Sequence, residues 1–152
     1  MAKESLLAAD SRMLEEFLAL SGILTGVENL DHELGSRYLD RLRRTPFEPF
    51  LRQILRQFRE LDSNPSVISQ VKKQIVDDGN LRPTICQIIL LWYTSAMQDE
   101  NPSSPTAVRY GVPEEYFSGL AWSIIGAHVP GLSGGYFGHW RYPPENDPSK
   151  GG

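Results

Sequence analysis

Cysteine is almost missing from this chain of 152 residues, which contains only Cys86. A disulfide within the chain needs two cysteines, and a metal site made of cysteine alone needs more, so both are excluded. The sequence neighbours Ile85 and Ile88 are apolar, which favours a small buried side chain at Cys86 over a reactive thiolate.

Long hydrophobic runs suited to a membrane are missing as well. The best candidate for a membrane-spanning helix, residues 83–98, is an uncharged stretch of 16 residues with several polar side chains. A span needs about 20 mostly apolar residues. Residues 1–30 carry five acidic side chains, a density that does not fit the basic and apolar regions of a secretory signal. We therefore expect neither a direct membrane span nor a secretory signal in this chain.

Excess positive charge is also absent, because the formal net charge is −4, and this argues against a general nucleic-acid binder. Hydrophobic residues make up 40% and charged residues 22%, which suits the core of one domain and excludes a wholly disordered chain. Residues 37–59 nevertheless contain seven arginines and two acidic residues, and Arg52, Arg56 and Arg59 share one predicted helix face. A solvated polar face is the favoured interpretation. Binding to an acidic patch on a protein partner is the functional alternative.

Apolar residues recur with helical spacing as far as residue 125. The pattern predicts six helices, at about 11–26, 31–45, 47–61, 64–76, 82–97 and 113–125. Ser11 and Asp31 are the predicted capping residues of the first two helices, Gly26 ends the first, and Pro113 begins the sixth. The fifth helix is apolar on nearly all sides and is predicted to be central or to lie under a partner. With no strand pattern and a polar loop expected over 99–111, the predicted fold is all-α, a bundle of about six helices.

The composition changes abruptly at residue 126. Residues 126–152 are rich in glycine and proline, which prevents a long helix or a central strand. Four aromatic residues nevertheless lie within seven positions, namely Tyr136, Phe137, Trp140 and Tyr142, whereas disordered tails are poor in such rings. We predict a helical domain over 1–125 and an irregular C-terminal docking arm over 126–152 in the same domain unit. The rings of the arm are expected to lie on the helical body or on another protein.

The residues of the arm also invite interpretations as a catalytic or cofactor site. Its glycines show neither the G-x-G-x-x-G nor the G-K-[ST] pattern, and no strand precedes them, so a nucleotide-binding loop is disfavoured. His128 and His139 lie eleven positions apart, a spacing that does not require them to meet at a metal. A histidine that is hydrogen-bonded in a loop or an interface is favoured instead. A stand-alone helical enzyme that uses His128 and His139 stays open as an alternative, as does a helical scaffold for an unrelated partner.

Three stretches together resemble a known family. They are FLALSGILTGVENLDHELGSRYLDRL at 17–42, ILLWYTS at 89–95 and YFSGLAWSIIGAHVPGLSGGYFGHWRYPPE at 116–145. The family they resemble is the small subunit of membrane-bound, FAD-dependent sugar and polyol dehydrogenases, of the sorbitol dehydrogenase small-subunit type. The resemblance covers the chain from about Leu14 to Glu145, and its third stretch is the most specific.

The resemblance implies a small subunit without a cofactor, which holds a large GMC-type flavoprotein in a competent fold and accompanies its export. FAD is then expected in that partner, which oxidises the sugar or polyol, and a multihaem c-type cytochrome commonly passes the electrons on. No catalytic, cofactor-binding or metal-binding residue is expected in this chain. The expected partner-binding residues are Trp122, His128, Tyr136, Phe137, His139, Trp140 and Tyr142.

The resemblance also implies a periplasmic location with the membrane-bound complex. Members of the family often begin with a twin-arginine export signal, which we do not expect in this chain because Arg43-Arg44 lies too far inside and no apolar region follows it. A cytoplasmic location is the alternative for a chain that natively has no leader.

Overall fold

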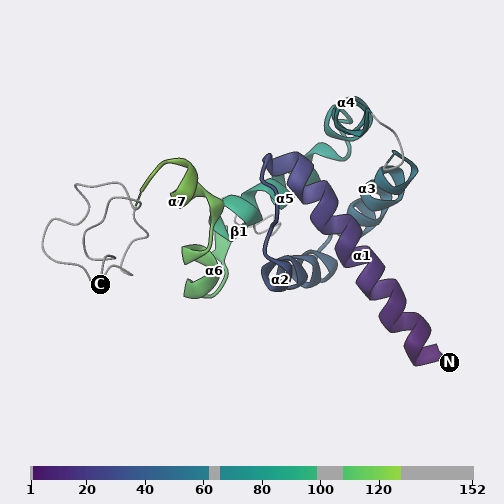
Figure 1. The fold of residues 1–152 in the computed structure, drawn as a ribbon, viewed down its shortest axis with the longest axis horizontal. Helices are drawn as coiled ribbons and strands as arrows, with labels where there is room; N and C mark the ends of the chain where they lie inside the picture. Colours follow the sequence, from purple (N-terminus) through teal and green to yellow (C-terminus); the bar gives the residue numbers. More distant parts are fainter. Residues whose placement is uncertain (1, 62–65, 99–107, 128–152) are drawn as a thin grey trace, which may run out of the picture. The chain divides into compact units, whose positions relative to one another are not determined.

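The computed structural model describes residues 2–61, 66–98 and 108–127 (Figure 1). The α-helices of these residues are α1 (Ala2–Thr25), α2 (His32–Arg43), α3 (Glu48–Leu61), α4 (Val67–Val71), α5 (Arg82–Thr94), α6 (Pro113–Phe117) and α7 (Leu120–Ile124). A π-helical segment, η1 (Lys72–Val76), continues α4, and the strands β1 (Ala96–Gln98) and β2 (Val108–Tyr110) pair in antiparallel fashion. The predicted all-α class is confirmed. The chain divides inside α5 into two compact units, unit 1 (Met1–Ile89) and unit 2 (Leu90–Gly152).

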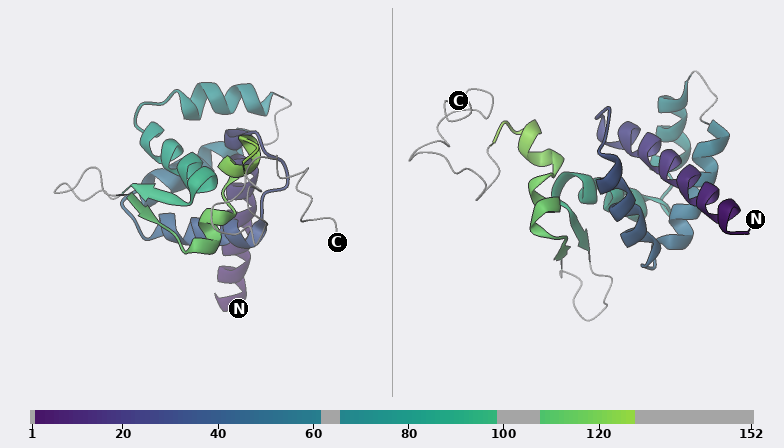
Figure 2. Two further views of the ribbon diagram at one scale, coloured as in Figure 1. Left: turned by 90° about the vertical axis from the view of Figure 1, so that its left-hand side faces the viewer. Right: turned by 60° about the horizontal axis from the view of Figure 1, so that its bottom comes forward.

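The core of unit 1 forms where α1 packs against α2 and α3, and where α3 packs against α4 and η1 (Figure 2). The face of α3 predicted from the apolar spacing is the inward one, since Leu51, Ile54 and Leu55 are at most 1% exposed. Two predicted core residues are exceptions, because Phe50 is 41% exposed and Ile68 is 68% exposed. Other large side chains buried in this unit include Phe17, Leu20, Tyr38, Leu42, Phe58, Ile75, Leu81 and Ile85.

The helix ends of unit 1 test the predicted capping residues. Asp31 caps α2 as predicted, and its carboxylate accepts a hydrogen bond of 2.7 Å from the backbone N–H of Leu34. Gly26 ends α1 as predicted, with a left-handed φ of +71° that glycine adopts without strain. The prediction for Ser11 is wrong, because α1 begins at Ala2 and Ser11 lies inside it. Residues 2–10 contain three alanines and two leucines, whose helix propensity outweighs the capping preference of one serine.

Several apolar side chains of α5 are buried, and Ile88, Leu91 and Trp92 are at most 1% exposed. Cys86 is exposed, so its predicted burial is wrong. It comes four residues after the exposed Arg82 and therefore lies on the same face of the helix. Apolar neighbours in the sequence did not indicate burial here, because adjacent residues on a helix point about 100° apart.

In unit 2, α5 is followed by Ser95, whose φ of +51° turns the chain into β1. Ala96 lies opposite Tyr110 in the β1–β2 pair, and Gln98 lies opposite Val108. The sequence analysis missed this pair because three-residue strands are too short to show an alternating pattern. The polar loop predicted over 99–111 is therefore wrong at 108–110, while residues 99–107 lie outside the described part of the chain.

The predicted sixth helix is divided into two short helices, α6 and α7. Pro113 begins α6 as predicted, where its missing N–H is not needed. Ser118 ends that helix, and Gly119 takes an extended conformation with φ −60° and ψ 138° before α7 begins. The result is a tight corner that places α7 beside the end of α5.

The length and hydropathy of a helix decide whether it can cross a membrane. Among the helices of the described residues, none combines the length and the apolar character that crossing a bilayer requires.

Candidate functional site

Trp122 is the only predicted partner-binding residue that lies within the described residues. Its indole N–H donates a hydrogen bond of 2.9 Å to the backbone carbonyl of Tyr116. The two rings also meet edge to face, with their centroids 5.2 Å apart and their planes at 78°. Trp122 is therefore held in place by the α6–α7 corner. The other predicted residues lie outside the described part of the chain: His128, Tyr136, Phe137, His139, Trp140 and Tyr142.

A pocket of about 290 Å³ opens next to Trp122 in unit 2. It lies between the end of α5, the strand β1 and the helices α6 and α7, and uncharged, largely apolar side chains surround it. The residues that line it are Leu90, Tyr93, Thr94, Ala96, Tyr116, Ala121 and Trp122. Sequence reasoning missed this pocket, because its lining residues come from four elements that no local pattern connects.

The pocket depends on a close approach between two backbones. A Cβ atom placed on Gly119 would lie 2.5 Å from the carbonyl oxygen of Tyr93 and 3.1 Å from that of Tyr116. Only glycine lets the start of α7 come this near to the last turn of α5. Gly119 thus sets the position of Ala121 and Trp122 relative to Tyr93 and Thr94.

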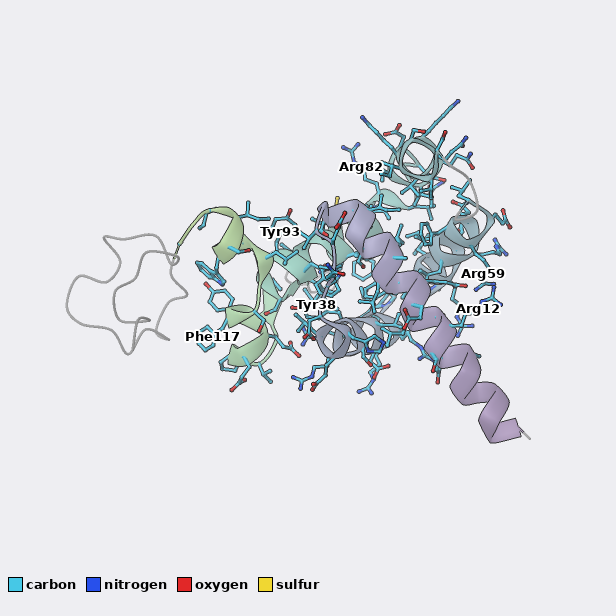
Figure 3. All side chains as sticks on the ribbon, in the orientation of Figure 1. Arg12, Tyr38, Arg59, Arg82, Tyr93 and Phe117 are labelled. Atoms are coloured by element: carbon cyan, nitrogen blue, oxygen red, sulfur yellow. The ribbon has the colours of Figure 1, made fainter. Side chains whose placement is uncertain are left out.

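Further apolar surface lies around the same corner. A second, shallower pocket of about 390 Å³ is lined by Gly111, Pro113, Tyr116 and Phe117. Figure 3 labels Phe117, which lines this pocket, and Tyr93, which lines the pocket beside Trp122. Ile124 and Ile125, at the end of α7, are 55% and 66% exposed. Large apolar side chains exposed together with apolar pockets are typical of surfaces that bind another molecule.

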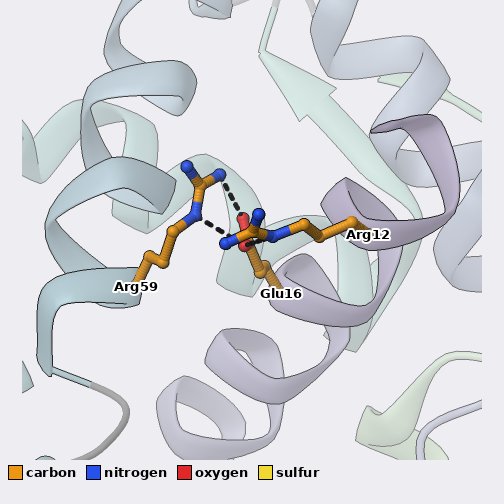
Figure 4. A network of polar contacts seen from close by, with 3 residues as sticks. All are labelled: Arg12, Glu16 and Arg59. Carbon is orange, nitrogen blue, oxygen red and sulfur yellow. Dashed lines mark hydrogen bonds and ion pairs between the residues drawn. The ribbon is translucent and has the colours of Figure 1, made fainter. Parts of the chain in front are cut away.

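The arginines of α3 present a different kind of surface. Arg59 binds the carboxylate of Glu16 on α1 with two hydrogen bonds of 2.7 and 2.8 Å, and Arg12 reaches the same carboxylate at 3.0 Å (Figure 4). Arg52 pairs with Glu48 on its own helix, and Arg43 of α2 lies 3.3 Å from Asp10 of α1. Much of this positive charge is therefore used within unit 1, which favours a structural role over an acidic partner.

The pKa of Glu16 reflects this arrangement. The hydrogen bond from Arg59 is the largest influence and lowers the pKa of Glu16 below its usual value. Partial burial of the carboxyl raises the pKa, but the further hydrogen bond from Arg12 adds to the lowering. Glu16 is therefore ionised at neutral pH and fastens α1 to α3.

Histidine, cysteine and carboxylate side chains are the remaining candidates for a metal or catalytic site. Within residues 2–61, 66–98 and 108–127, no group of three or more histidine, cysteine, aspartate or glutamate side chains could hold a metal ion. His32 lies in the first turn of α2 and is exposed, with its Nε2 atom 3.2 Å from the Glu15 carboxylate of α1. The arrangement that an enzyme would build from His128 and His139 lies outside the described residues.

Most of the chain matches a known protein family. Residues 1–110 match the model of a protein family described as membrane-bound, FAD-containing D-sorbitol dehydrogenase. The match extends through β2 and ends before α6, so the resembling stretch at 116–145 lies beyond it. No curated protein matches the chain at a significant level.

Proposed function

We propose that this chain, which belongs to the family of membrane-bound, FAD-containing D-sorbitol dehydrogenases, is the non-catalytic small subunit of a sugar or polyol dehydrogenase complex. In this role it binds and stabilises the FAD-containing catalytic subunit and helps it to mature or to be exported. The partner is a GMC-type flavoprotein, and a multihaem c-type cytochrome is the further member of the complex. The complex works on the periplasmic side of the membrane.

The apolar surface of unit 2 is the observation that carries this proposal. The pocket beside Trp122 and the exposed Ile124 and Ile125 present apolar area that a partner would cover. Because α7 directly precedes the C-terminal arm in the sequence, we assign this surface and the arm to one docking region. The partner-binding residues are therefore Trp122 together with His128, Tyr136, Phe137, His139, Trp140 and Tyr142.

The residues of unit 2 do not suit FAD itself. A dinucleotide needs donors for its pyrophosphate, usually backbone N–H groups at the start of a long helix after a strand. The residues that line the pocket beside Trp122 carry no charge, and α7 has only five residues. We therefore assign FAD to the partner and no redox step to this chain.

Two isoleucines of nearly equal exposure allow a sharp test. Ile125 in unit 2 is 66% exposed and Ile68 in unit 1 is 68% exposed, so aspartate at either position should hardly change folding. Buried at an interface, an unpaired carboxylate is costly. Ile125→Asp should therefore weaken the complex with the FAD-containing subunit at least about tenfold, or 1.4 kcal/mol, whereas Ile68→Asp should not.

The measurement is co-purification of the flavoprotein with the tagged full-length chain from native cells, quantified by flavin absorbance. Loss of flavin with Ile125→Asp alone supports the docking region. Equal loss of flavin with both variants would contradict the assignment of the interface to unit 2. If the wild-type chain co-purifies no flavoprotein, the proposed function is contradicted. Dehydrogenase turnover by the isolated chain would contradict its non-catalytic role.

A further inference from the structure

The end of α7 delivers the rest of the chain to the edge of the pocket beside Trp122. Gly126 turns the backbone with a φ of +62°, and the N–H of Ala127 donates a hydrogen bond of 3.0 Å to the carbonyl of Trp122. The following residues therefore start about one helical turn from a side chain that lines the pocket. An aromatic residue that follows Ala127 can therefore reach this pocket within the same chain.

We propose that the pocket beside Trp122 holds the indole ring of Trp140 from the chain's own C-terminal arm while the subunit is free. The ring leaves the pocket when the catalytic subunit binds, and only this release step rests on the proposed function. The arm thus has two alternative docking places, one on its own unit 2 and one on the partner.

Chain length permits this contact. Trp140 comes 13 residues after Ala127, and an extended chain spans up to about 3.3–3.6 Å per residue, far more than the distance across one small pocket. A ring tethered by so short a segment is present at an effective concentration in the millimolar range. A ring of the same chain therefore has an advantage over the same ring of a second copy at ordinary protein concentrations.

The chemistry of the pocket suits an indole. Tyr116 and Trp122 offer ring surfaces for edge-to-face contact, and Leu90 and Ala121 are apolar. The hydroxyl of Thr94 donates a hydrogen bond of 2.8 Å to the carbonyl of Leu90 and accepts one of 3.3 Å from the N–H of Ala96. The second lone pair of its oxygen is available as an acceptor toward the indole N–H. A volume of about 290 Å³ accommodates one such side chain.

A ring of the same chain protects the pocket of an unassembled subunit. An apolar pocket that waits for a partner favours self-association, and a ring from the same chain covers it at a small entropic cost. The covering ring must leave before the partner can use the arm. Assembly then exchanges one aromatic contact for another.

Fluorine NMR of the full-length chain labelled with 5-fluorotryptophan tests the inference without the partner. The chain has three tryptophans, so Trp140→Phe assigns the Trp140 signal. In the free wild-type chain this signal should be protected from a paramagnetic relaxation agent in the solvent. Ala121→Leu fills the pocket and should abolish that protection, whereas Ser123→Leu, an exposed position on the same helix outside the pocket, should preserve it.

Three results would overturn the inference: a Trp140 signal as accessible in the wild type as in Ala121→Leu, equal effects of the two leucine variants, or protection that disappears on dilution. The last would indicate exchange of arms between two copies. If Ala121→Leu disturbs the fold, Trp140→Phe serves as the second readout, because removing the indole should move the Trp122 signal. Addition of the FAD-containing subunit should shift the Trp140 signal further. Absence of that shift contradicts the proposed function and leaves the result for the free chain unaffected.

Discussion

Gly119→Ala tests the close approach on which the candidate site depends. The added Cβ would lie 2.5 Å from the carbonyl oxygen of Tyr93 and 3.2 Å from its carbonyl carbon. Because a Cβ atom is essentially never found within 3.0 Å of such an atom, the two backbones must separate by at least half an ångström. The φ and ψ angles of Gly119 are open to alanine, so the penalty is steric and not conformational.

The expected magnitude follows from two opposing effects. Overpacking costs roughly 1–3 kcal/mol, and here the obstacle is backbone that cannot rotate away as a side chain would. Replacing glycine by alanine also lowers the entropy of the unfolded chain, which stabilises the fold by about 0.4–1 kcal/mol. We therefore expect Gly119→Ala to lower the free energy of unfolding by about 1–2 kcal/mol and to move α7 with its Trp122.

Two other glycines provide matched controls. Gly126 has open space around its Cβ position but a φ of +62°, so Gly126→Ala should cost about 1 kcal/mol through backbone strain alone. Gly79 has open space and no left-handed φ, and Gly79→Ala should be neutral or slightly stabilising.

Urea unfolding followed by circular dichroism gives the stabilities, and hydrogen exchange over 90–98 and 111–127 locates the effect. Gly119→Ala should speed exchange in both segments. If Gly119→Ala is as stable as Gly79→Ala, with unchanged exchange near Tyr93, then α7 does not rest on the end of α5 and the reasoning is refuted.

Two further predictions concern unit 1. Because Arg59 lowers the pKa of Glu16, this pair stabilises the fold fully above the usual pKa of glutamate, and its contribution is lost as the pH falls through the lowered pKa. Glu16→Gln should therefore have a lower urea midpoint than the wild type at pH 7. The difference should shrink as the pH falls below the usual pKa of glutamate, and a constant difference would contradict the role of this pair. Ser21 is fully buried and its hydroxyl has no hydrogen-bond partner among the described residues. Ser21→Ala should therefore raise the free energy of unfolding by up to about 1 kcal/mol. A clear loss of stability would show that the hydroxyl is bonded.

The amino-acid sequence by itself determined the helical class and most helix positions. Leu51, Ile54 and Leu55 follow the helical period and are buried in unit 1, because a helix can bury apolar side chains only if they share a face. Asp31 and Pro113 marked the starts of α2 and α6, since capping and the missing N–H of proline act within a few residues. The resemblance to the sorbitol dehydrogenase small subunit likewise came from the sequence, and the family match confirms it.

The tertiary structure alone decided the contacts between segments that are distant in the chain. Glu16 meets Arg59 across 43 positions, and the carbonyl of Tyr93 meets Gly119, although no periodicity links either pair. The pocket beside Trp122 exists because four elements converge on it, and the exposure of Cys86 depends on which face of α5 is covered. Local patterns encode the preferences of single helices, whereas the packing of one helix on another depends on shape, volume and charge summed over many residues.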